Sequence, residues 1–224
     1  MKQVEHLKLS GQLPSPRGIA LAILELSRRE NATLGEIARI VQTDPALSGR
    51  LIKLANSASQ IARPVVSVQE AVVRQGMNTV RQLALGFSLL DQYRGGACKA
   101  FNYQAYWSHS LLMALCMQSL GERVHIAAAD ELFVCGLLAQ VGKLALATVY
   151  PDEYSAVLTA HQADPTQTLV SHERGRLETD HIELGIVMMT DWGLPRVFTG
   201  PLAHYEDPDH PSYPHDSRSN SLML

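Results

Sequence analysis

The sequence predicts an all-α protein. Three observations support this: apolar residues recur at helical spacing along most of the chain, capping motifs precede several of these runs, and no stretch alternates apolar and polar residues as a strand does. Of the 224 residues, 46% are hydrophobic and 18% are charged, which is typical of a globular protein with a substantial core.

The first hundred residues contain five predicted helices with clear start signals. Thr33 with Glu36 has the form of a capping box, in which two residues cap each other's backbone N–H groups. Asp44 followed by Pro45 is typical of an N-cap with proline at the first helical position. Gly76 is expected to separate the fourth helix from the fifth. The five helices are expected at residues 19–26, 34–41, 45–55, 68–75 and 78–93.

The second half of the chain is organised around residues 126–150, which are apolar at nearly every position. A helix without a polar face is normally buried, so we expect one central helix here, with Gly136 and Gly142 allowing close packing of its neighbours. Gln140 and Lys143 interrupt the run and argue against a membrane span, which needs about 20 apolar residues. Other helices are expected at 102–120, 152–161, 165–173 and 180–192, and a short one is expected to end near residue 204. In the helix at 102–120, the side chains expected to face inward are Trp107, Leu111, Leu112 and Leu115.

Charge is distributed unevenly along the chain. Residues 1–100 hold 13 Lys and Arg against 7 Asp and Glu, a balance of +6, whereas residues 101–224 hold 6 against 15, a balance of −9. This predicts an N-terminal helical lobe, 1–95, and a second helical lobe, 96–205, followed by 206–224 as a tail or the start of a linker to a further domain. Either the lobes attract each other, or the basic lobe meets an anionic partner.

The three cysteines, Cys98, Cys116 and Cys135, are odd in number and lack the spacing of a metal site. Cys116 and Cys135 lie in apolar helical runs and are expected to be small core residues. The N-terminal residues lack the apolar core of a signal peptide. A reducing, cytoplasmic location is therefore expected.

Three histidines, His109, His181 and His204, are the candidates for chemistry. Gathered around a metal they would form a catalytic site, because imidazole binds several divalent ions. Otherwise each is a hydrogen-bonded histidine of the core or of a cleft, which is the interpretation we favour. Lys143 either neutralises a phosphate or buries its aliphatic stem while its ammonium stays in water.

Residues 33–57 give a second, separate hypothesis. Two helices joined by a tight turn are compatible with a helix-turn-helix, and the second of them carries Arg50 and Lys53. Such helix pairs are common in any α-protein, however, and the exposed polar face of this one is thin. Nucleic-acid binding by the basic lobe therefore stays an alternative that we do not favour.

Eight short motifs follow one another in a characteristic order between Leu13 and Tyr205. They are Leu13-Pro-Ser-Pro16, Asp44-Pro-Ala-Leu47, Leu54-Ala-Asn-Ser-Ala58, Ala71 through Gly76, Tyr106-Trp-Ser-His109, Gly136-Leu-Leu with Val141-Gly-Lys143, Asp180-His-Ile-Glu-Leu-Gly185 and Trp192-Gly-Leu-Pro195. In this order the set resembles the HDOD family of bacterial signalling modules, which are relatives of the HD and HD-GYP phosphohydrolases.

The resemblance implies an HD-domain-like helical core preceded by an N-terminal helical lobe, and a regulatory role without catalysis. In HD-type enzymes a His-Asp pair of the central motif binds metal, and Ala139 and Gln140 stand at those positions here. Tyr205 stands where a second histidine commonly follows His204. Ala139 has no lone pair and Gln140 has no negative charge, so we expect no catalytic residue, no metal and no cofactor.

We therefore expect a signal-transduction module that acts by binding a protein or a ligand, with no membrane contact. Its expected partners are signalling proteins, among them an attached or separate domain related to cyclic di-GMP. The competing hypothesis is a metal-dependent phosphohydrolase acting on nucleotides or cyclic di-GMP. The predicted binding site is a degenerate HD cleft between the two lobes that holds His109, Ala139, Gln140, Lys143, His181 and His204.

Overall fold

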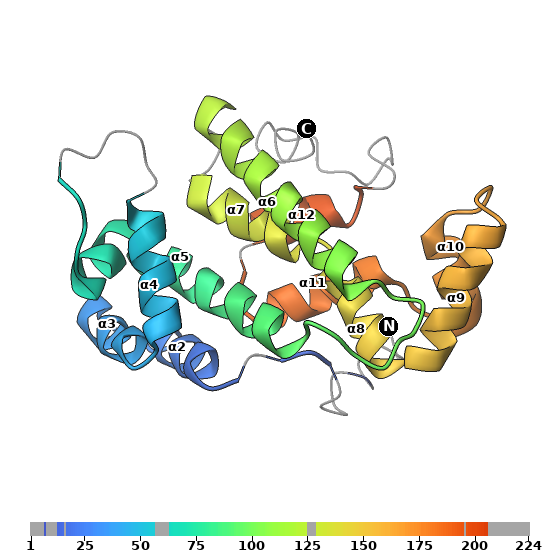
Figure 1. Cartoon of the computed structure of the whole chain (residues 1–224), viewed down its shortest axis with the longest axis horizontal. Helices are drawn as coiled ribbons and strands as arrows, with labels where there is room; N and C mark the ends of the chain where they lie inside the picture. Colours follow the sequence, from blue (N-terminus) through green and yellow to red (C-terminus); the bar gives the residue numbers. More distant parts are fainter. Residues whose placement is uncertain are drawn as a thin grey trace. The chain divides into compact units, whose positions relative to one another are not determined.

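The structure, a computed structural model, describes residues 7, 13–15, 17–56, 63–124, 129–194 and 196–205, and its regular structure there is entirely helical. The all-α prediction is confirmed. The chain divides into two compact units (Figure 1): the N-terminal unit, Ser15–Gln92, and the C-terminal unit, Met1–Pro14 with Tyr93–Leu224. The predicted tail, 206–224, lies outside the described residues.

The N-terminal unit is built around its longest helix. That helix, α5, packs against each of the three shorter helices that precede it. Ile23, Ile37 and Leu51, one from each shorter helix, are almost completely buried, so the core of this unit forms on the face of α5 that they cover. The helices are α2 (Ile19–Ser27), α3 (Leu34–Gln42), α4 (Pro45–Ala55) and α5 (Val68–Gln92).

The helix starts predicted for this unit are confirmed. Thr33 Oγ1 accepts from the Glu36 N–H at 3.2 Å while Glu36 Oε2 accepts from the Thr33 N–H at 3.0 Å, which completes the capping box. Asp44 Oδ1 accepts from the first N–H groups of α4 at 2.9 and 3.0 Å. Gly76 has φ 78° and ψ 164°, a conformation that glycine adopts readily, and it divides α5 at the predicted point.

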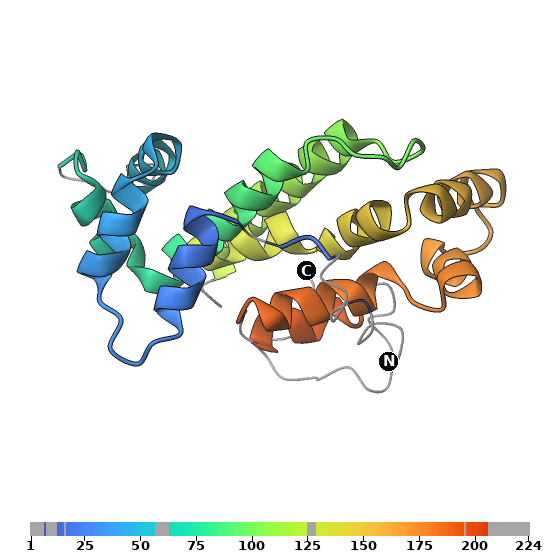
Figure 2. The same ribbon diagram turned by 90° about the horizontal axis from the view of Figure 1, so that it is seen from below.

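The C-terminal unit consists mainly of helices packed in pairs. α6 lies against α7, α8 against α11, and α9 against α10, and the α9–α10 pair lies at one end of the unit in both views (Figures 1 and 2). The helices are α6 (Tyr103–Val124), α7 (Ala129–Leu138), α8 (Val141–Val149), α9 (Pro151–Ala163), α10 (Leu169–Leu177), α11 (His181–Asp191) and α12 (Arg196–Leu202).

The prediction of one continuous helix over 126–150 is wrong. The stretch contains two helices, α7 and α8, separated by a turn at Ala139 and Gln140. Both helices are buried, so apolar composition alone does not reveal the turn between them. The segment Leu132–Val149 is apolar and long enough to cross a membrane, but 72% of it is buried, as in the core of a globular protein.

Gly136 and Gly142 allow close packing, as predicted. A Cβ at Gly136 would lie 2.7 Å from backbone atoms of Ala114 in α6, which is closer than real Cβ contacts. Trp107 is buried as predicted, but the inward placement of the three leucines of α6 is wrong, and this approach explains why. α6 meets α7 through its small residue Ala114, so Leu111, Leu112 and Leu115 lie on the exposed side. Cys116, expected in the core, is exposed as well.

The helix start predicted at Asp164 and Pro165 is also wrong. Asp164 follows the end of α9, and its carboxylate accepts from the N–H of Thr166 at 3.2 Å and from Gln167 Nε2 at 3.3 Å. An aspartate can close a turn in this way as readily as it can cap a helix. α10 begins four residues later, where Thr168 Oγ1 accepts from the Ser171 N–H at 3.2 Å.

Candidate functional site

The two positions that correspond to the HD pair lie in the turn between α7 and α8. Ala139 and Gln140 are half-buried there. Gln140 precedes α8 and its side chain makes no capping hydrogen bond, whereas its backbone oxygen accepts from the Lys143 N–H at 3.0 Å. The turn therefore provides a neutral amide and a methyl group where a metal site would need an imidazole and a carboxylate.

Gly142 brings this turn next to α11. A Cβ at Gly142 would overlap the backbone oxygen of His181 and would lie 2.8 Å from the backbone nitrogen of Gly185. Only a residue without a side chain allows α8 to approach α11 so closely. The first turn of α8, which includes the half-buried Lys143, is thereby fixed beside His181.

His181 belongs to a polar group that we call the His181 network: Tyr154, Glu173 and His181, which are buried, and Tyr205, which is half-buried. His181 Nδ1 lies 2.6 Å from Glu173 Oε2, and His181 Nε2 lies 2.6 Å from the hydroxyl of Tyr205. The same Glu173 oxygen accepts from the His181 backbone N–H at 3.0 Å, and the Tyr154 hydroxyl donates to Glu173 Oε1 at 3.1 Å. Glu173 and Tyr154 are completely buried, and His181 is 2% exposed.

The chemistry of this network follows from which groups can donate. An ionised carboxylate only accepts, so Nδ1 of His181 donates to Glu173. Nε2 then pairs with the Tyr205 hydroxyl, as the acceptor in a neutral imidazole or as the donor in a protonated one, so both ring nitrogens are used. Glu173 receives three donors, which compensate for burying its carboxylate. The network thus holds the His181 ring in one position.

Neighbouring polar contacts fix the start of α11. Asp180 is the N-cap, and its Oδ1 accepts from the Glu183 N–H at 2.8 Å. Its Oδ2 accepts from Arg174 Nε at 2.7 Å, an ion pair in which the Asp180 side chain is buried and the Arg174 side chain is exposed. The Asp180 cap and the Glu173 contact together orient the first turn of α11, which begins with His181.

Tyr154 gives this network a pH dependence in alkali. Burial raises the pKa of its phenol well above the usual value, and the neighbouring Glu173 carboxylate raises it further. The folded state therefore holds this proton more tightly than the unfolded state, and the resulting stabilisation is complete below about pH 10 and decreases as the pH rises above it.

We expect Tyr154→Phe to remove this alkaline sensitivity. The free energy of unfolding should be lower for the variant at pH 8, because Glu173 loses a donor, and the gap between the two proteins should narrow by up to about 1.4 kcal/mol per pH unit above pH 10. Urea unfolding between pH 8 and pH 11.5 measures the gap. A gap that stays constant over this range would show that Tyr154 does not titrate differently in the folded state.

The remaining predicted site residues are placed as follows. His109 is exposed on α6. His204 is half-buried after α12, its N–H donates to the oxygen of Pro201 at 3.0 Å, and it precedes Tyr205 of the network. Among the described residues, no three His, Cys, Asp or Glu side chains are grouped so that they could hold a metal ion. A joint cleft formed by all six predicted residues stays a prediction.

Sequence reasoning missed the role of Glu173. It lies in a helix rich in charged residues, where a buried carboxylate has no local signal. Its partners are 19 residues before it, at Tyr154, and 8 residues after it, at His181. In the sequence, Tyr205 is only a departure from a common histidine, whereas in the structure its hydroxyl lies within hydrogen-bond distance of His181 Nε2.

An open pocket of about 580 Å³ lies at the corner between α10 and α11. Three carboxylates and one guanidinium line it: Glu178, Asp180, Glu183 and Arg174. An excess of negative charge repels phosphate groups, so this pocket is poorly suited to a nucleotide or a cyclic dinucleotide.

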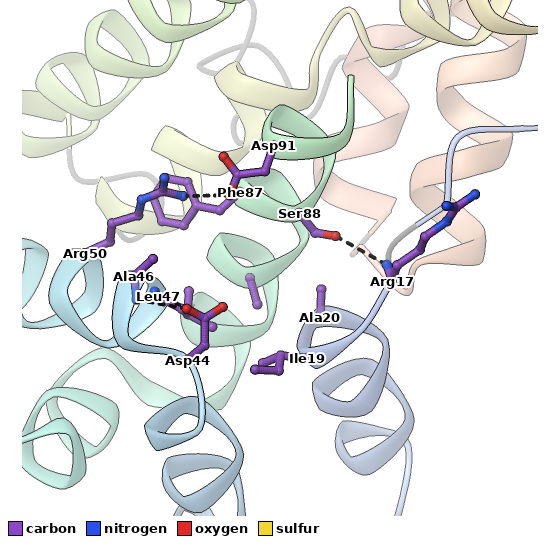
Figure 3. Close-up of a pocket in the computed structure, with 11 residues that line it drawn as sticks. Arg17, Ile19, Ala20, Asp44, Ala46, Leu47, Arg50, Phe87, Ser88 and Asp91 are labelled. Atoms are coloured by element: carbon purple, nitrogen blue, oxygen red, sulfur yellow. Dashed lines mark hydrogen bonds and ion pairs between the residues drawn. The ribbon is translucent and has the colours of Figure 1, made fainter. Parts of the chain in front are cut away.

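The N-terminal unit has a smaller pocket, of about 90 Å³, between α2, α4 and α5 (Figure 3). Inside it, the guanidinium of Arg50 lies over the ring of Phe87, 4.5 Å from the centroid, and pairs with Asp91 at 3.5 Å. The Arg17 side chain points away from the pocket. A cavity of about 150 Å³ holds benzene, so this one is too small for a base or a nucleotide.

These contacts bear on the helix-turn-helix hypothesis. A recognition helix needs side chains that are directed outward to the bases. Arg50, one of the two basic residues that suggested such a helix, is directed instead to α5 of its own unit. Lys53 alone remains as an exposed cation of the original pair, which is a weak basis for reading DNA.

Comparison with known proteins gives matches along nearly the whole chain. Residues 13–208 match the HDOD domain. The MmoQ response regulator of Methylococcus capsulatus str. Bath is 40% identical, and the match covers 92% of this chain and 81% of that one with a TM-score of 0.52. No curated protein was found to match.

Two further solved structures are 23% identical and show the fold alone. An HDOD domain protein of unknown function from Geobacter sulfurreducens has a TM-score of 0.72, with 99% of this chain and 74% of that chain covered. A protein from Shewanella amazonensis SB2B, named as a candidate phosphohydrolase, has a TM-score of 0.71, with 99% and 76% covered.

Proposed function

This chain belongs to the HDOD domain family, and from that premise we propose that it is a signal-transduction module that works by binding and does not hydrolyse phosphoesters. The relative that is 40% identical is a response regulator, which favours a signalling role for this chain too. We further propose that its partners are other signalling proteins and that it acts in the bacterial cytoplasm.

This proposal rests on one observation: the residues around the first turn of α8 supply no free metal ligands. Ala139 and Gln140 supply neither an imidazole nor a carboxylate. His181, whose backbone the first turn of α8 approaches at Gly142, has both ring nitrogens within 2.6 Å of other protein groups. A nitrogen that is hydrogen-bonded to Tyr205, as acceptor or as donor, offers no free lone pair to a metal, so these residues do not fit the metal of an HD-type enzyme.

The phosphohydrolase alternative would need an open metal site with several imidazole and carboxylate ligands. The described residues offer no such group, and the open pocket between α10 and α11 carries more negative than positive charge. The structures whose names suggest hydrolysis share only the fold with this chain. The observations therefore favour binding over hydrolysis.

Metal content tests the proposal at its physical basis. Protein purified without a His-tag and equilibrated with Mn²⁺, Fe²⁺ or Zn²⁺ should retain well under one equivalent per chain, and His181→Ala should leave that content unchanged. Elemental analysis by mass spectrometry is the measurement, with circular dichroism to confirm that the variant is folded.

A variant that restores the pair, Ala139→His with Gln140→Asp, serves as the comparison. It returns an imidazole and a carboxylate to the turn and should raise the metal content above that of the natural chain. One full equivalent in the natural chain, lost in His181→Ala, would contradict the assignment of His181 to a closed hydrogen-bonded network.

A further inference from the structure

The outer side of α6 carries a surface that we call the leucine face: Leu111, Leu112, Leu115, Cys116 and Leu120. The four leucines are 47%, 58%, 50% and 44% exposed, and Cys116 is exposed as well. Residues three and four positions apart share a helix face, so these side chains form one stripe about two and a half turns long. Scattered exposed leucines are ordinary, but a continuous stripe of them is typical of a contact surface.

The opposite side of α6 is already occupied. Tyr106, Ser110 and Ala114 are buried there, and α7 runs beside α6 in both views (Figures 1 and 2). α6 therefore has apolar residues on two sides, although only one side packs against the residues of the C-terminal unit that the structure describes. A stripe of exposed leucines that no described residue covers is available to a further partner.

The charge of the helix indicates what this partner is. Residues 103–121 contain no Asp, Glu, Lys or Arg. Two identical surfaces meet across a two-fold axis without like-charge repulsion only when they are uncharged or self-complementary, and this one is uncharged. A membrane-surface helix would carry Lys or Arg beside its apolar face, and this segment has none.

We propose that the leucine face binds the leucine face of a second copy of this chain, so that two α6 helices pair in a homodimer. The midpoint between Leu111 and Leu120 falls between Leu115 and Cys116. In an antiparallel pair centred on the stripe, the two-fold axis passes there and Cys116 meets its own copy. Helices packed about 8–10 Å apart bring facing Cα atoms within the range of about 4.4–6.8 Å that a disulfide needs.

Sedimentation velocity of the full chain tests the pairing. The natural chain should dimerise, and Leu112→Glu should raise the dissociation constant about 100-fold or more, because each dimer then buries two charges within an apolar contact. The matched control is Val73→Glu, which places the same charge at an exposed apolar position of α5 and should leave the constant unchanged. A monomeric natural chain, or equal effects of the two variants, would overturn the proposal.

Cysteine oxidation gives a second readout that does not depend on how well Leu112→Glu folds. Cys116 is exposed while Cys98 and Cys135 are buried, and these are the only cysteines of the chain. Mild oxidation of the reduced protein should give a covalent dimer. At protein concentrations above the dissociation constant, the rate of crosslinking should not change on dilution. Cys116→Ser should abolish the crosslink. If crosslinking slows in proportion to dilution under those conditions, the cysteines meet only by random collision and the proposal fails.

Discussion

Replacing Gly142 with alanine is expected to lower the free energy of unfolding of the C-terminal unit by about 3 kcal/mol. The added methyl group would overlap the backbone oxygen of His181, and backbone cannot turn aside as a flexible side chain does. The higher helix propensity of alanine than of glycine offsets at most about 1 kcal/mol of this loss, so the clash between α8 and α11 dominates. Urea unfolding followed by circular dichroism measures the loss.

Gly175→Ala is the control for this substitution. Gly175 also lies in a helix, α10, but a Cβ there would meet nothing within 4 Å. The same chemical change should therefore leave stability unchanged or raise it by up to about 1 kcal/mol. Equal effects of the two substitutions would contradict the close approach of α8 to α11.

Replacing Glu173 with alanine is expected to lower the free energy of unfolding by at least about 3 kcal/mol, because each buried donor left without an acceptor costs about 1–3 kcal/mol. Three donors would be left buried without an acceptor: the hydroxyl of Tyr154, and the backbone N–H and Nδ1–H of His181. Thermal and urea unfolding measure the loss, and the chemical shifts of the His181 ring report on its altered surroundings.

Glu173→Gln keeps the shape of the side chain and removes its negative charge, so it tests the role of charge in the same network. The amide oxygen can accept from both His181 groups, while the amide N–H can donate to the Tyr154 oxygen, so each group keeps a partner. The decrease in the free energy of unfolding should be less than half of the decrease caused by Glu173→Ala. A glutamine variant as unstable as the alanine variant would mean that charge, and not the number of hydrogen bonds, holds the network together.

Features encoded by neighbouring residues were predictable from the sequence. The capping box at Thr33 and Glu36, the cap at Asp44 and the break at Gly76 each depend on atoms within four residues, and each is present in the structure. Where one local pattern permits two outcomes, the prediction failed. Asp164 followed by proline can begin a helix or close a turn, and in this chain it closes a turn.

Features that depend on contacts between distant helices were not predictable. The turn at Ala139 and Gln140 separates two buried apolar helices, so hydrophobicity gives no signal for it. The inward face of α6 is set by its approach to Gly136, because apolar residues line both sides of that helix. Glu173 becomes part of the candidate site only when α10 and α11 are folded together.

The most direct measurement of a non-catalytic function is a turnover assay on the full chain. The untagged protein is incubated with cyclic di-GMP and with generic phosphodiesters, each in the presence of added Mn²⁺, Mg²⁺ or Fe²⁺, and products are quantified by chromatography. We predict no hydrolysis above the metal-only background, because Ala139 and Gln140 supply no metal ligands and the nitrogens of His181 are bound to Glu173 and Tyr205. Steady turnover that is lost in His181→Ala or His109→Ala would contradict this and would make the protein an enzyme.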